Sequence, residues 1–589
     1  MRTGAPDITT ERAPVRIVRR PADGDAGALS TTLDPLLRRL YAARGDVGCA
    51  LSLSTLHPFD KLHDIDRAVD LLEQAIRAEQ HILVVGDYDA DGATGTALAI
   101  RGLVALGAQR PSYLIPSRFK HGYGLSPPVV DAAAAHDPDL ILTVDNGIAS
   151  HDGVERAREL GIPVLVTDHH LPGEALPGAV AIVNPNQPGC AFPSKHLCGV
   201  GVMFYLLVAL RGRLRETGWF RSEHDEPNLA AFLDLVALGT VADVVTLDDN
   251  NRVLVEQGLR RIRAGRCCRG VTALLEVAGK DPSAVTSRDL GFYAAPRLNA
   301  AGRLGDMSLG IECLLTDDPG HAQRLARRLD ELNRQRREIE GDMREEAESL
   351  LDGLRLDGEA LPAGLCLFGE GWHQGVAGIL AARVRERYHR PVIAFANADG
   401  GLLRGSARSI DGLHIRDLID AVDRRCPGVI ERFGGHAMAA GLSLRVEALE
   451  RFRGAFVEQV QRELGDRPPV REILSDGELG AEHLTLNTAE MLRTAGPWGK
   501  GFPEPLFDGE FRVLQRRLVG GCHLKLRLQL PGLGVMEAIG FNQGDLLEQA
   551  VGEVHLAYRL DVNEYRGLKS PQLILEHLQS TNYTSWKDV

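Results

Sequence analysis

The sequence predicts two α/β domains joined by a long helix and followed by a small β barrel. Three observations lead to this α/β assignment. Short apolar runs alternate with helix-like segments from about His81 to Leu247, a pattern typical of a doubly wound parallel sheet. A charged segment without Gly or Pro between His321 and Ile339 indicates one long exposed helix. Apolar and polar residues alternate after residue 472, which indicates short β-strands.

The first part of the chain predicts a tail and then a helix. Residues 1–32 are rich in Thr, Pro, Arg, Asp and Gly and have no apolar core, so we expect a flexible tail without a secretory signal. Between about Leu33 and Glu79, apolar residues such as Ile65 and Leu72 recur at helical spacing. This periodicity predicts a helix that packs on the following sheet.

Acidic residues follow three of the predicted strands. The apolar runs 82–85, 140–144 and 163–167 each lead directly into acids or histidines. Because ligands of parallel sheets bind beyond the carboxyl ends of the strands, these side chains should share one crevice. They are Asp87, Asp89, Asp91, Asp145, Asp168, His169 and His170. So many carboxylates require cations, and oxygen-rich ligands favour magnesium or manganese. A solvated acidic turn is the alternative for any single stretch.

A basic and aromatic loop, residues 115–125, interrupts the strand and helix pattern. It contains Arg118, with Lys120 and His121 nearby. A guanidinium group matches a terminal phosphate well, so we predict that Arg118 contacts phosphate. The alternative is an ordinary surface loop.

The remaining chain predicts a second α/β domain and a barrel. Gly-rich turns that open helices, at 370–379 and 433–441, expose backbone N–H groups to anions. Arg467-Pro468-Pro469 indicates a linker. The predicted parts are a tail (1–32), a first α/β domain (33–316), a connecting helix (317–355), a second α/β domain (356–466), a barrel (467–578) and a C-terminal tail (579–589).

Composition indicates a globular protein of a reducing compartment. Of the 589 residues, 44% are hydrophobic and 25% are charged, and no apolar run approaches the roughly 20 residues that span a bilayer. The nine cysteines form no Cys-x-x-Cys pair, which favours the cytoplasm. The net charge of −13 argues against nucleic-acid binding, but bound metal ions would mask part of it and DNA responds to local charge.

The acidic motifs also carry a family resemblance. Asp89-Ala90-Asp91-Gly92, Val144-Asp145-Asn146-Gly147 and Asp168-His169-His170 resemble successive motifs of the DHH phosphoesterase superfamily, and the segment 239–245 resembles a fourth that supplies Asp243. Within the superfamily, Gly86 to Gly92 is typical of the RecJ exonuclease family. The resemblance extends over nearly the whole chain, from about Leu33 to about Leu578.

This resemblance implies a 5′→3′ exonuclease that acts on single-stranded DNA and releases nucleoside monophosphates with two divalent cations, manganese or magnesium. The implied metal ligands are Asp87, Asp89, Asp91, Asp145, His169 and Asp243, with Asp168, His170 and His373 supporting them. The implied contacts to the 5′-phosphate and DNA are Arg118, Ser406, Arg408, Arg303, Gly434, Gly435 and His436.

The resemblance further implies a DHH-associated domain that grips the substrate and a C-terminal OB-fold. Basic candidates for strand binding by that fold are Lys500, Lys525, Arg516 and Arg517. The implied partners are single-stranded DNA, a single-strand-binding protein and a helicase. The expected protein is a cytoplasmic monomer without membrane association that acts in DNA recombination and repair.

Two other functional readings remain open. One is a DHH phosphoesterase that acts on short oligoribonucleotides, cyclic dinucleotides or pyrophosphate, but such proteins are typically shorter and lack the barrel. The other is a DNA-binding factor that has kept the fold and lost the metals. The complete set of acids and histidines argues against the second reading.

Overall fold

A computed structural model of the chain describes residues 15–21, 29–45, 48, 51–118, 123–222, 225–356, 361–465, 470–530 and 534–580. The chain divides into two compact units. The parallel-sheet unit comprises Pro21–Asn333 and Thr485–Pro505. The barrel unit comprises Met1–Arg20, Arg334–Leu484 and Leu506–Val589. Each unit is therefore built from separate stretches of the chain.

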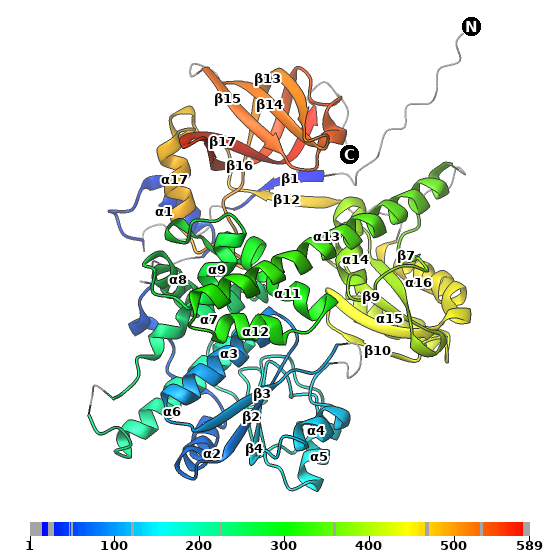
Figure 1. Cartoon of the computed structure of the whole chain (residues 1–589). Helices are drawn as coiled ribbons and strands as arrows, with labels where there is room; N and C mark the ends of the chain where they lie inside the picture. The colour runs from blue at the N-terminus through cyan, green and yellow to red at the C-terminus, as the bar shows by residue number, and fades with distance from the viewer. Residues whose placement is uncertain are drawn as a thin grey trace. The chain divides into compact units, whose positions relative to one another are not determined.

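A five-stranded parallel sheet forms the base of the parallel-sheet unit (Figure 1). Its strand order is β3-β2-β4-β5-β6, and every neighbouring pair is parallel. The strands are β2 (His81–Gly86), β3 (Arg110–Leu114), β4 (Leu140–Val144), β5 (Val164–Thr167) and β6 (Ala181–Val183). The residues of β2, β4 and β5 are buried on both faces, which explains why these strands are continuous apolar runs.

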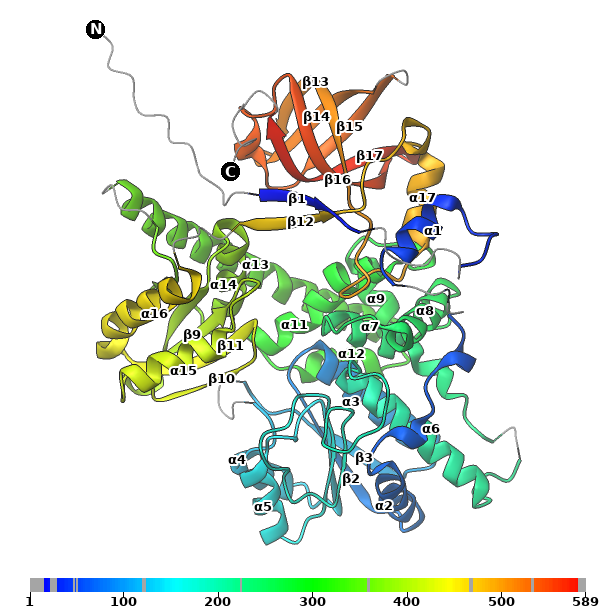
Figure 2. The ribbon, with the colours of Figure 1, turned by 180° about the vertical axis from the view of Figure 1, so that it is seen from behind.

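Helices cover both faces of this sheet. One face packs on α2 (Ile65–Arg77), α3 (Ala90–Ala105) and α6 (Gly199–Glu216). The other packs on α4 (Pro127–Ala134) and α5 (His151–Glu159), which Figure 2 shows from behind. Alternate residues of β2, such as Val84 and Val85, belong to the two separate cores. The predicted doubly wound parallel sheet is confirmed.

Further helices complete this unit. They are α1 (Pro35–Ala42), α7 (Leu233–Ala242), α8 (Asp249–Arg263), α9 (Arg269–Val277), α10 (Ser287–Asp289), the π-helix η5 (Leu290–Ala294), α11 (Ala295–Leu304), α12 (Ser308–Leu315) and α17 (Leu486–Thr494). The 3₁₀ helices are η1 (Leu53–Thr55), η2 (Phe59–Lys61), η3 (Leu229–Phe232) and η4 (Pro282–Ala284). The expected long helix is α13 (Pro319–Leu356), which begins in this unit and ends in the barrel unit.

A mixed sheet lies in the barrel unit, with the order β10-β11-β9-β8-β7. Its strands are β7 (Leu365–Phe368), β8 (Val392–Ala398), β9 (Leu402–Arg408), β10 (Arg432–Gly435) and β11 (Ala439–Arg445). Its helices are α14 (Ala377–Tyr388), α15 (Ile415–Arg425) and α16 (Leu449–Leu464), with the 3₁₀ helices η6 (Asp399–Gly401) and η7 (Val446–Ala448). Trp372 donates its indole N–H to Glu346 of α13 at 2.6 Å, which ties the second half of α13 to this α/β domain.

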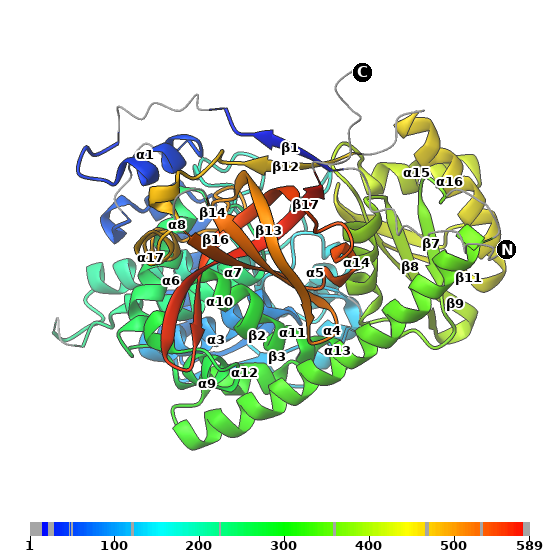
Figure 3. The same cartoon turned by 90° about the horizontal axis from the view of Figure 1, so that it is seen from above.

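The same unit contains a closed five-stranded barrel of order β13-β14-β15-β17-β16, visible from above in Figure 3. Its strands are β13 (Phe507–Val519), β14 (His523–Leu530), β15 (Gly534–Gly540), β16 (Glu553–Tyr565) and β17 (Leu568–Ser580), with η8 (Ala481–His483) and η9 (Gly544–Leu546). The predicted α/β domains, long helix and C-terminal barrel are thus all present.

The prediction of a flexible tail over residues 1–32 is wrong for β1 (Val15–Arg19), which pairs in parallel with β12 (Arg471–Ser475). The side chain of Arg19 binds the carboxylate of Asp508 on β13 through Nε at 3.1 Å and Nη2 at 2.9 Å. Composition concealed this strand because its partner lies more than 450 residues later in the chain. Residues 1–14, 22–28 and 581–589 lie outside the described residues.

The sequence predicts that residues 467–578 all belong to the barrel. The segment Thr485–Pro505 instead packs in the parallel-sheet unit. Trp498 and Phe502 stack with ring centroids 5.1 Å apart. Arg44 lies over the ring of Trp498 at 5.5 Å, and Arg252 lies over Phe502 at 3.7 Å. These cation–π contacts attach the segment to the unit, and Lys500 lies with it. None of the helices in the described ranges is both long and apolar enough to span a bilayer.

Candidate metal centre

Three acids follow the adjacent ends of three strands. The last residues of β2, β4 and β5 lie side by side in the sheet. Asp87, Asp145 and Asp168 come directly after these strands. All three side chains are buried. The expected crevice at the carboxyl edge of the sheet therefore contains one carboxylate from each strand.

The ligand atoms of these and neighbouring residues approach each other closely. In each of three groups, the nitrogen and oxygen atoms lie within 4.8 Å of one another: Asp145, His169 and His170; Asp91, His169 and Asp243; Asp87, Asp89 and Asp145. The imidazole Nε2 of His169 lies 3.1 Å from Asp145, 3.5 Å from Asp243 and 3.9 Å from Asp91. We call the seven residues in these groups the acidic cluster.

Helix ends place Asp89 and Asp91. Asp89 caps the N-terminus of α3, where one carboxylate oxygen accepts the N–H groups of Asp91 and Gly92 at 3.0 Å. The carboxylate of Asp91 accepts the N–H groups of Gly199 at 2.6 Å and Val200 at 2.9 Å, at the N-terminus of α6. Two helix N-termini therefore help to hold negative charge in the acidic cluster.

Asp145 adopts an unusual backbone conformation. Its φ of 64° is left-handed, which costs free energy for a non-glycine residue. Gly199 lies against it, and a Cβ at Gly199 would lie 2.4 Å from the Cβ of Asp145, so no larger residue fits. The hydroxyl of Tyr123 donates to the carbonyl oxygen of Asp145 at 3.0 Å and also lies 3.1 Å from Nδ1 of His170. Sequence reasoning had assigned Tyr123 no role at this site.

The electrostatics of the cluster favour bound cations. Burial raises the pKa of Asp91 from 3.8 to about 7, and the charge of Asp89 adds to this effect. Burial and neighbouring carboxylates also raise the pKa values of Asp87, Asp145 and Asp243 well above the usual range. One buried oxygen of Asp87 has no hydrogen-bond partner among the described residues. The residues present therefore fit divalent metal ions, whose charge would relieve this repulsion.

Asp168 faces a different set of neighbours. Its carboxylate accepts the N–H groups of Ile148 at 2.9 Å and His169 at 2.7 Å, and it contacts Nδ1 of His170 at 2.7 Å. Burial alone would raise its pKa, but the hydrogen bond and charge of His170 outweigh burial and lower it. Burial alone would lower the pKa of His170, but Asp168 and other nearby acids raise it to about 9. Asp168 thus orients the two histidines.

Two asparagines that sequence reasoning missed hold the same turn. The side-chain amide of Asn184 donates to the carbonyl oxygen of His170 at 2.9 Å. The amide of Asn186 donates to the carbonyl oxygen of His169 at 2.6 Å. The backbone N–H of Asn186 also donates to the side-chain oxygen of Asn184. The only available signal was the Asn-Pro-Asn sequence after β6, which is typical of any turn.

Arg118 lies at the Asp87 side of the cluster. Its guanidinium group covers the ring of Tyr88 at 4.1 Å, and its buried Nε has no hydrogen-bond partner among the described residues. Its positive charge opposes the rise in the pKa of Asp87 that burial and Asp89 cause. Lys120 and His121 lie outside the described residues. The predicted phosphate contact of Arg118 stays a prediction.

The segment around Arg303 supports the start of α3. Asn299 on α11 accepts the N–H of Ala90 at 2.9 Å. A Cβ at Gly302 would lie 1.8 Å from the carbonyl oxygen of Tyr88, so the two backbones touch. Arg303 itself is partly buried at the end of α11. Its predicted role in DNA binding stays a prediction, and the observed role of this segment is to position Asp89 and its neighbours.

The other predicted substrate contacts lie in the barrel unit. Ser406 and Arg408 are on β9, next to the first turn of α14 at Gly378. Burial lowers the pKa of Arg408, and the charge of Arg385 acts in the same direction. Arg408 forms no ion pair with another described residue, whereas Arg385 contacts Glu386 at 3.5 Å, so Arg408 is the cation of the two that suits an anion. The imidazole Nδ1 of His373 accepts the N–H of Gly375 at 3.1 Å.

A Gly-rich hairpin carries the last predicted contacts. Gly434 and Gly435 are on β10, and His436 follows with an exposed side chain. Gly435 has a φ of 146°, and a Cβ there would lie 2.4 Å from Cα of Ala440, so glycine is required. That these residues and His373 face the acidic cluster stays a prediction, because they belong to the other unit.

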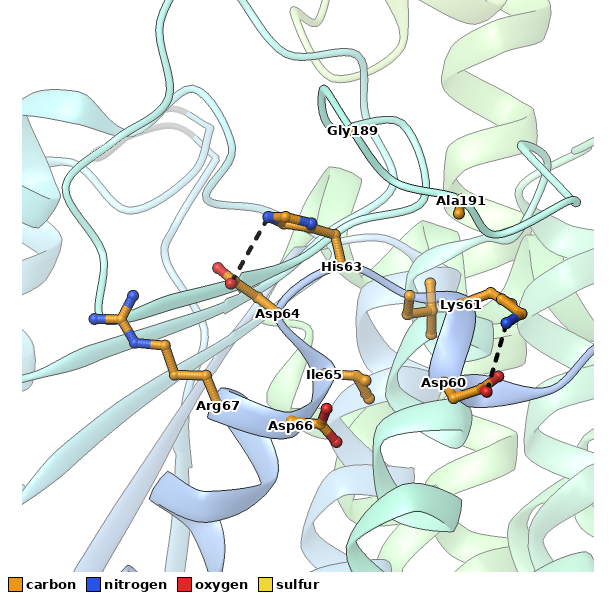
Figure 4. Close-up of a pocket in the computed structure, with 10 residues that line it drawn as sticks. Asp60, Lys61, His63, Asp64, Ile65, Asp66, Arg67, Gly189 and Ala191 are labelled. Atoms are coloured by element: carbon orange, nitrogen blue, oxygen red, sulfur yellow. Dashed lines mark ion pairs between the residues drawn. The ribbon is translucent and has the colours of Figure 1, made fainter.

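A cavity of about 510 Å³ opens beside the N-terminus of α2 (Figure 4). Within it, Lys61 pairs with Asp60 at 3.6 Å and His63 lies 3.9 Å from Asp64. Asp64 also accepts the N–H of Ile182 at 3.2 Å. Four of the charged or titratable groups of this cavity thus form two contacting pairs, and none of the predicted site residues lines it.

Comparison with family profiles gives three matches along the chain. The family described as "DHH family, N-terminal domain" matches residues 81–240. The "DHHA1 domain" matches residues 362–463, and the "RecJ OB domain" matches residues 475–577. The first match contains every member of the acidic cluster except Asp243.

Whole-chain relatives are equally consistent. The single-stranded-DNA-specific exonuclease RecJ of Salmonella typhimurium is 53% identical over 95% of this chain and 98% of its own. The crystal structure of Thermus thermophilus RecJ with Mn²⁺ matches with a TM-score of 0.78 and 32% identity, over 96% of this chain and 80% of that chain. Its Mg²⁺ complex matches with a TM-score of 0.73 and 30% identity, over 96% and 78%.

Proposed function

Because the chain belongs to the RecJ family of single-stranded-DNA-specific exonucleases, we propose that it degrades single-stranded DNA in the 5′→3′ direction. The reaction is metal-dependent hydrolysis of phosphodiester bonds that releases nucleoside 5′-monophosphates. The observation that carries this proposal is the acidic cluster, where burial and mutual repulsion raise the pKa values of four carboxylates. Such a cluster is favourable only with bound cations.

The residues of the cluster would hold two divalent cations, manganese or magnesium, the ions in the two Thermus thermophilus complexes. The proposed ligands are Asp87, Asp89, Asp91, Asp145, His169 and Asp243. Bound there, divalent cations stabilise negative charge on the phosphodiester and activate water as the nucleophile. Asp168 and His170 orient His169, and Tyr123 holds the backbone of Asp145 through its hydroxyl group. His373 is proposed to stabilise developing charge.

Selectivity for the 5′ end is assigned to cations that lack carboxylate partners. Arg118 has an unpartnered buried Nε among the described residues, and Arg408 is a buried cation beside Arg385. Together with Ser406 they would bind the terminal phosphate and so set the length of the released product at one nucleotide. Arg303, Gly434, Gly435 and His436 are proposed to contact the following DNA.

The domain assignments follow the same proposal. Residues 33–316 would bind metal, residues 317–355 would connect the domains, residues 356–466 would grip the substrate, and residues 467–578 would contain the OB-type barrel, with terminal segments at 1–32 and 579–589. The profile matches at 81–240, 362–463 and 475–577 support the three central assignments. The barrel cations Lys525 and Arg516 contact Glu537 and Glu548, which weakens their candidacy as strand-binding residues.

The cellular setting is proposed from the family. An enzyme that acts only on single strands requires another activity to open duplex DNA, so a helicase and a single-strand-binding protein are the proposed partners in recombination and repair. A cytoplasmic monomer is the proposed form.

The decisive experiment uses single-stranded DNA labelled at either end, with Mn²⁺, Mg²⁺ or a chelator. We expect mononucleotides to appear first from the 5′-labelled strand, and the chelator to abolish their release. Release that begins at the 3′ label would overturn the assignment of Arg118, Ser406 and Arg408. Faster hydrolysis of short oligoribonucleotides or cyclic dinucleotides would instead favour another phosphoesterase activity.

A further inference from the structure

Three segments that are distant in the sequence meet at the C-terminal end of α7, directly after Asp243. The N–H of Leu247 donates to the carbonyl oxygen of Lys500 at 2.7 Å. A Cβ at Gly501 would lie 2.4 Å from the side chain of Thr246, so the two loops touch. The hydroxyl of Ser287 on α10 donates to the carbonyl oxygen of Trp498 at 2.7 Å, which brings in the third segment.

That third segment continues into η5, which packs against α7. A Cβ at Gly291 would lie 3.1 Å from Cγ1 of Val241, two residues before Asp243. Gly291 and its neighbour Phe292 therefore lie beside the helix end that carries a member of the acidic cluster. We call Val244, Phe292 and Lys500 the α7 rim.

The α7 rim exposes large apolar side chains on unusual backbone. Phe292 is 69% exposed and Val244 is 60% exposed. Phe292 is part of a π-helix, a conformation that occurs frequently at functional sites. Val244 has a φ of 58°, which is unfavourable for a β-branched residue. Folding alone gives no reason to keep an aromatic ring in water on such a backbone, which points to a binding role.

Two cations lie near different members of the acidic cluster. Arg118 lies at the Asp87 side, beside Tyr88. Lys500 lies near Asp243, because its carbonyl oxygen accepts the N–H of Leu247, four residues after that acid. Lys500 forms no ion pair with any residue that the structure describes. A polyanion bound at the acidic cluster could therefore contact one cation near Asp87 and another near Asp243.

We propose that the α7 rim binds the nucleotide on the 3′ side of the scissile bond, with Phe292 stacked on its base and Lys500 against its 3′-phosphate. This subsite rests on the proposed function, in which Arg118 contacts the terminal 5′-phosphate. Exposed aromatic rings and basic side chains are the usual combination for sequence-independent binding of single strands. The rim thereby places the second phosphodiester of the strand, while the acidic cluster acts on the first.

The test compares matched oligonucleotides with a 5′-phosphate, one natural and one abasic at the second nucleotide. Loss of one stacked base should lower kcat/KM of the wild type by about tenfold. Phe292→Ala should cleave the natural strand about as slowly as the wild type cleaves the abasic strand. This variant should cleave its natural and abasic strands at the same rate, so it has no abasic penalty. Phe292→Trp should keep the penalty, and so should Leu160→Ala, a control at another partly exposed apolar position of this unit.

A second pair of substrates tests Lys500. A neutral methylphosphonate between the second and third nucleotides should slow the wild type and Lys61→Ala, a control lysine in the cavity of Figure 4. Lys500→Ala should be insensitive to it. An abasic penalty that persists in Phe292→Ala, or no penalty in the wild type, would overturn the subsite alone. Absence of any cleavage by the wild type would overturn the proposed function as well.

Discussion

The two units contain buried acids in opposite electrostatic situations. In the parallel-sheet unit, four carboxylates of the acidic cluster have pKa values raised by burial and by one another. In the barrel unit, the buried carboxylate of Asp508 contacts Arg19, Ser475 and His555. Burial alone would raise the pKa of Asp508, but these hydrogen bonds and the charge of Arg19 lower it.

The difference separates a functional acid from a structural one. Asp508 receives all its compensation from the chain and connects β1, β12 and the barrel. The acidic cluster receives only partial compensation from helix N-termini and His170, so its remaining charge must be balanced by something that binds. The raised pKa values of the acidic cluster therefore indicate function, whereas the lowered pKa of Asp508 indicates a structural ion pair.

Replacing one acid of the cluster should have the largest effect on activity. Asp145→Asn should lower kcat by about 10³-fold or more, because metal binding and charge stabilisation are lost together. The same change should leave the metal-free protein as stable as the wild type or more so, because it removes a repelling charge. Activity assays and thermal unfolding with a chelator measure both quantities. If Asp145→Asn is inactive and also less stable than the wild type without metal, Asp145 would be a stabilising acid, contrary to the comparison with Asp508.

Loss of the hydrogen bond from Asn186 to His169 should lower activity less than loss of a cluster acid. Asn186→Ala should reduce Mn²⁺ affinity and kcat by about 10–100-fold, because His169 loses a partner that fixes its backbone. Calorimetric titration with Mn²⁺ measures the affinity, and Asn228→Ala, an exposed helix cap of the same unit, is the control. Unchanged Mn²⁺ affinity would show that Asn186 does not orient His169 for metal binding.

Removing the charge of Asp508 should lower the stability of the protein and leave kcat unchanged. Asp508→Asn should lower the free energy of unfolding of the barrel unit by about 2 kcal/mol, because hydrogen bonds to a charged acceptor are weakened. The estimate is modest because the Arg19 side chain is 60% exposed. Denaturant unfolding measures it, with Glu510→Gln, an exposed acid of the same strand, as the control. At low temperature kcat should match the wild type, and a large loss of kcat would argue against a structural role.

The two regions should also respond to pH with opposite signs. The folded-state pKa of Asp91 is about 7 against an ordinary 3.8, so metal-free stability should fall as pH rises between these values. The folded-state pKa of Asp508 is lowered, so its contribution is present above the ordinary pKa and is lost as pH falls through the folded value. Chelator-treated Asp91→Asn should show a flatter decline toward pH 7, and an unchanged decline would assign the effect to other groups.

The sequence was sufficient for features that depend on local order along the chain. The strands before Asp87, Asp145 and Asp168 were predictable because buried parallel strands are short apolar runs with turns after them. Their convergence followed from the geometry of parallel sheets. The basic position Arg118 was also visible because a cation in a glycine-containing loop is a local signal.

Features that depend on long-range packing were not predictable. β1 has no local signal that distinguishes it from a tail, because its partner β12 lies at the other end of the chain. The sequence predicts Lys500 in the barrel, since no local pattern indicates the contacts of Trp498 with Arg44 and Phe502. Asn186 looked like an ordinary turn residue, and only the fold reveals its contact with His169.

The discontinuous composition of the units has a consequence for biosynthesis. A ribosome that has reached residue 484 has made the whole acidic cluster but not Trp498, Lys500 or Phe502. β1 is made before β12 and must wait for it, more than 450 residues later, before it can pair. The parallel-sheet unit can therefore finish folding only after residues 485–505 have been made, and the barrel unit only after β17. Both units therefore complete their folding only long after the first residues of the acidic cluster have been synthesised.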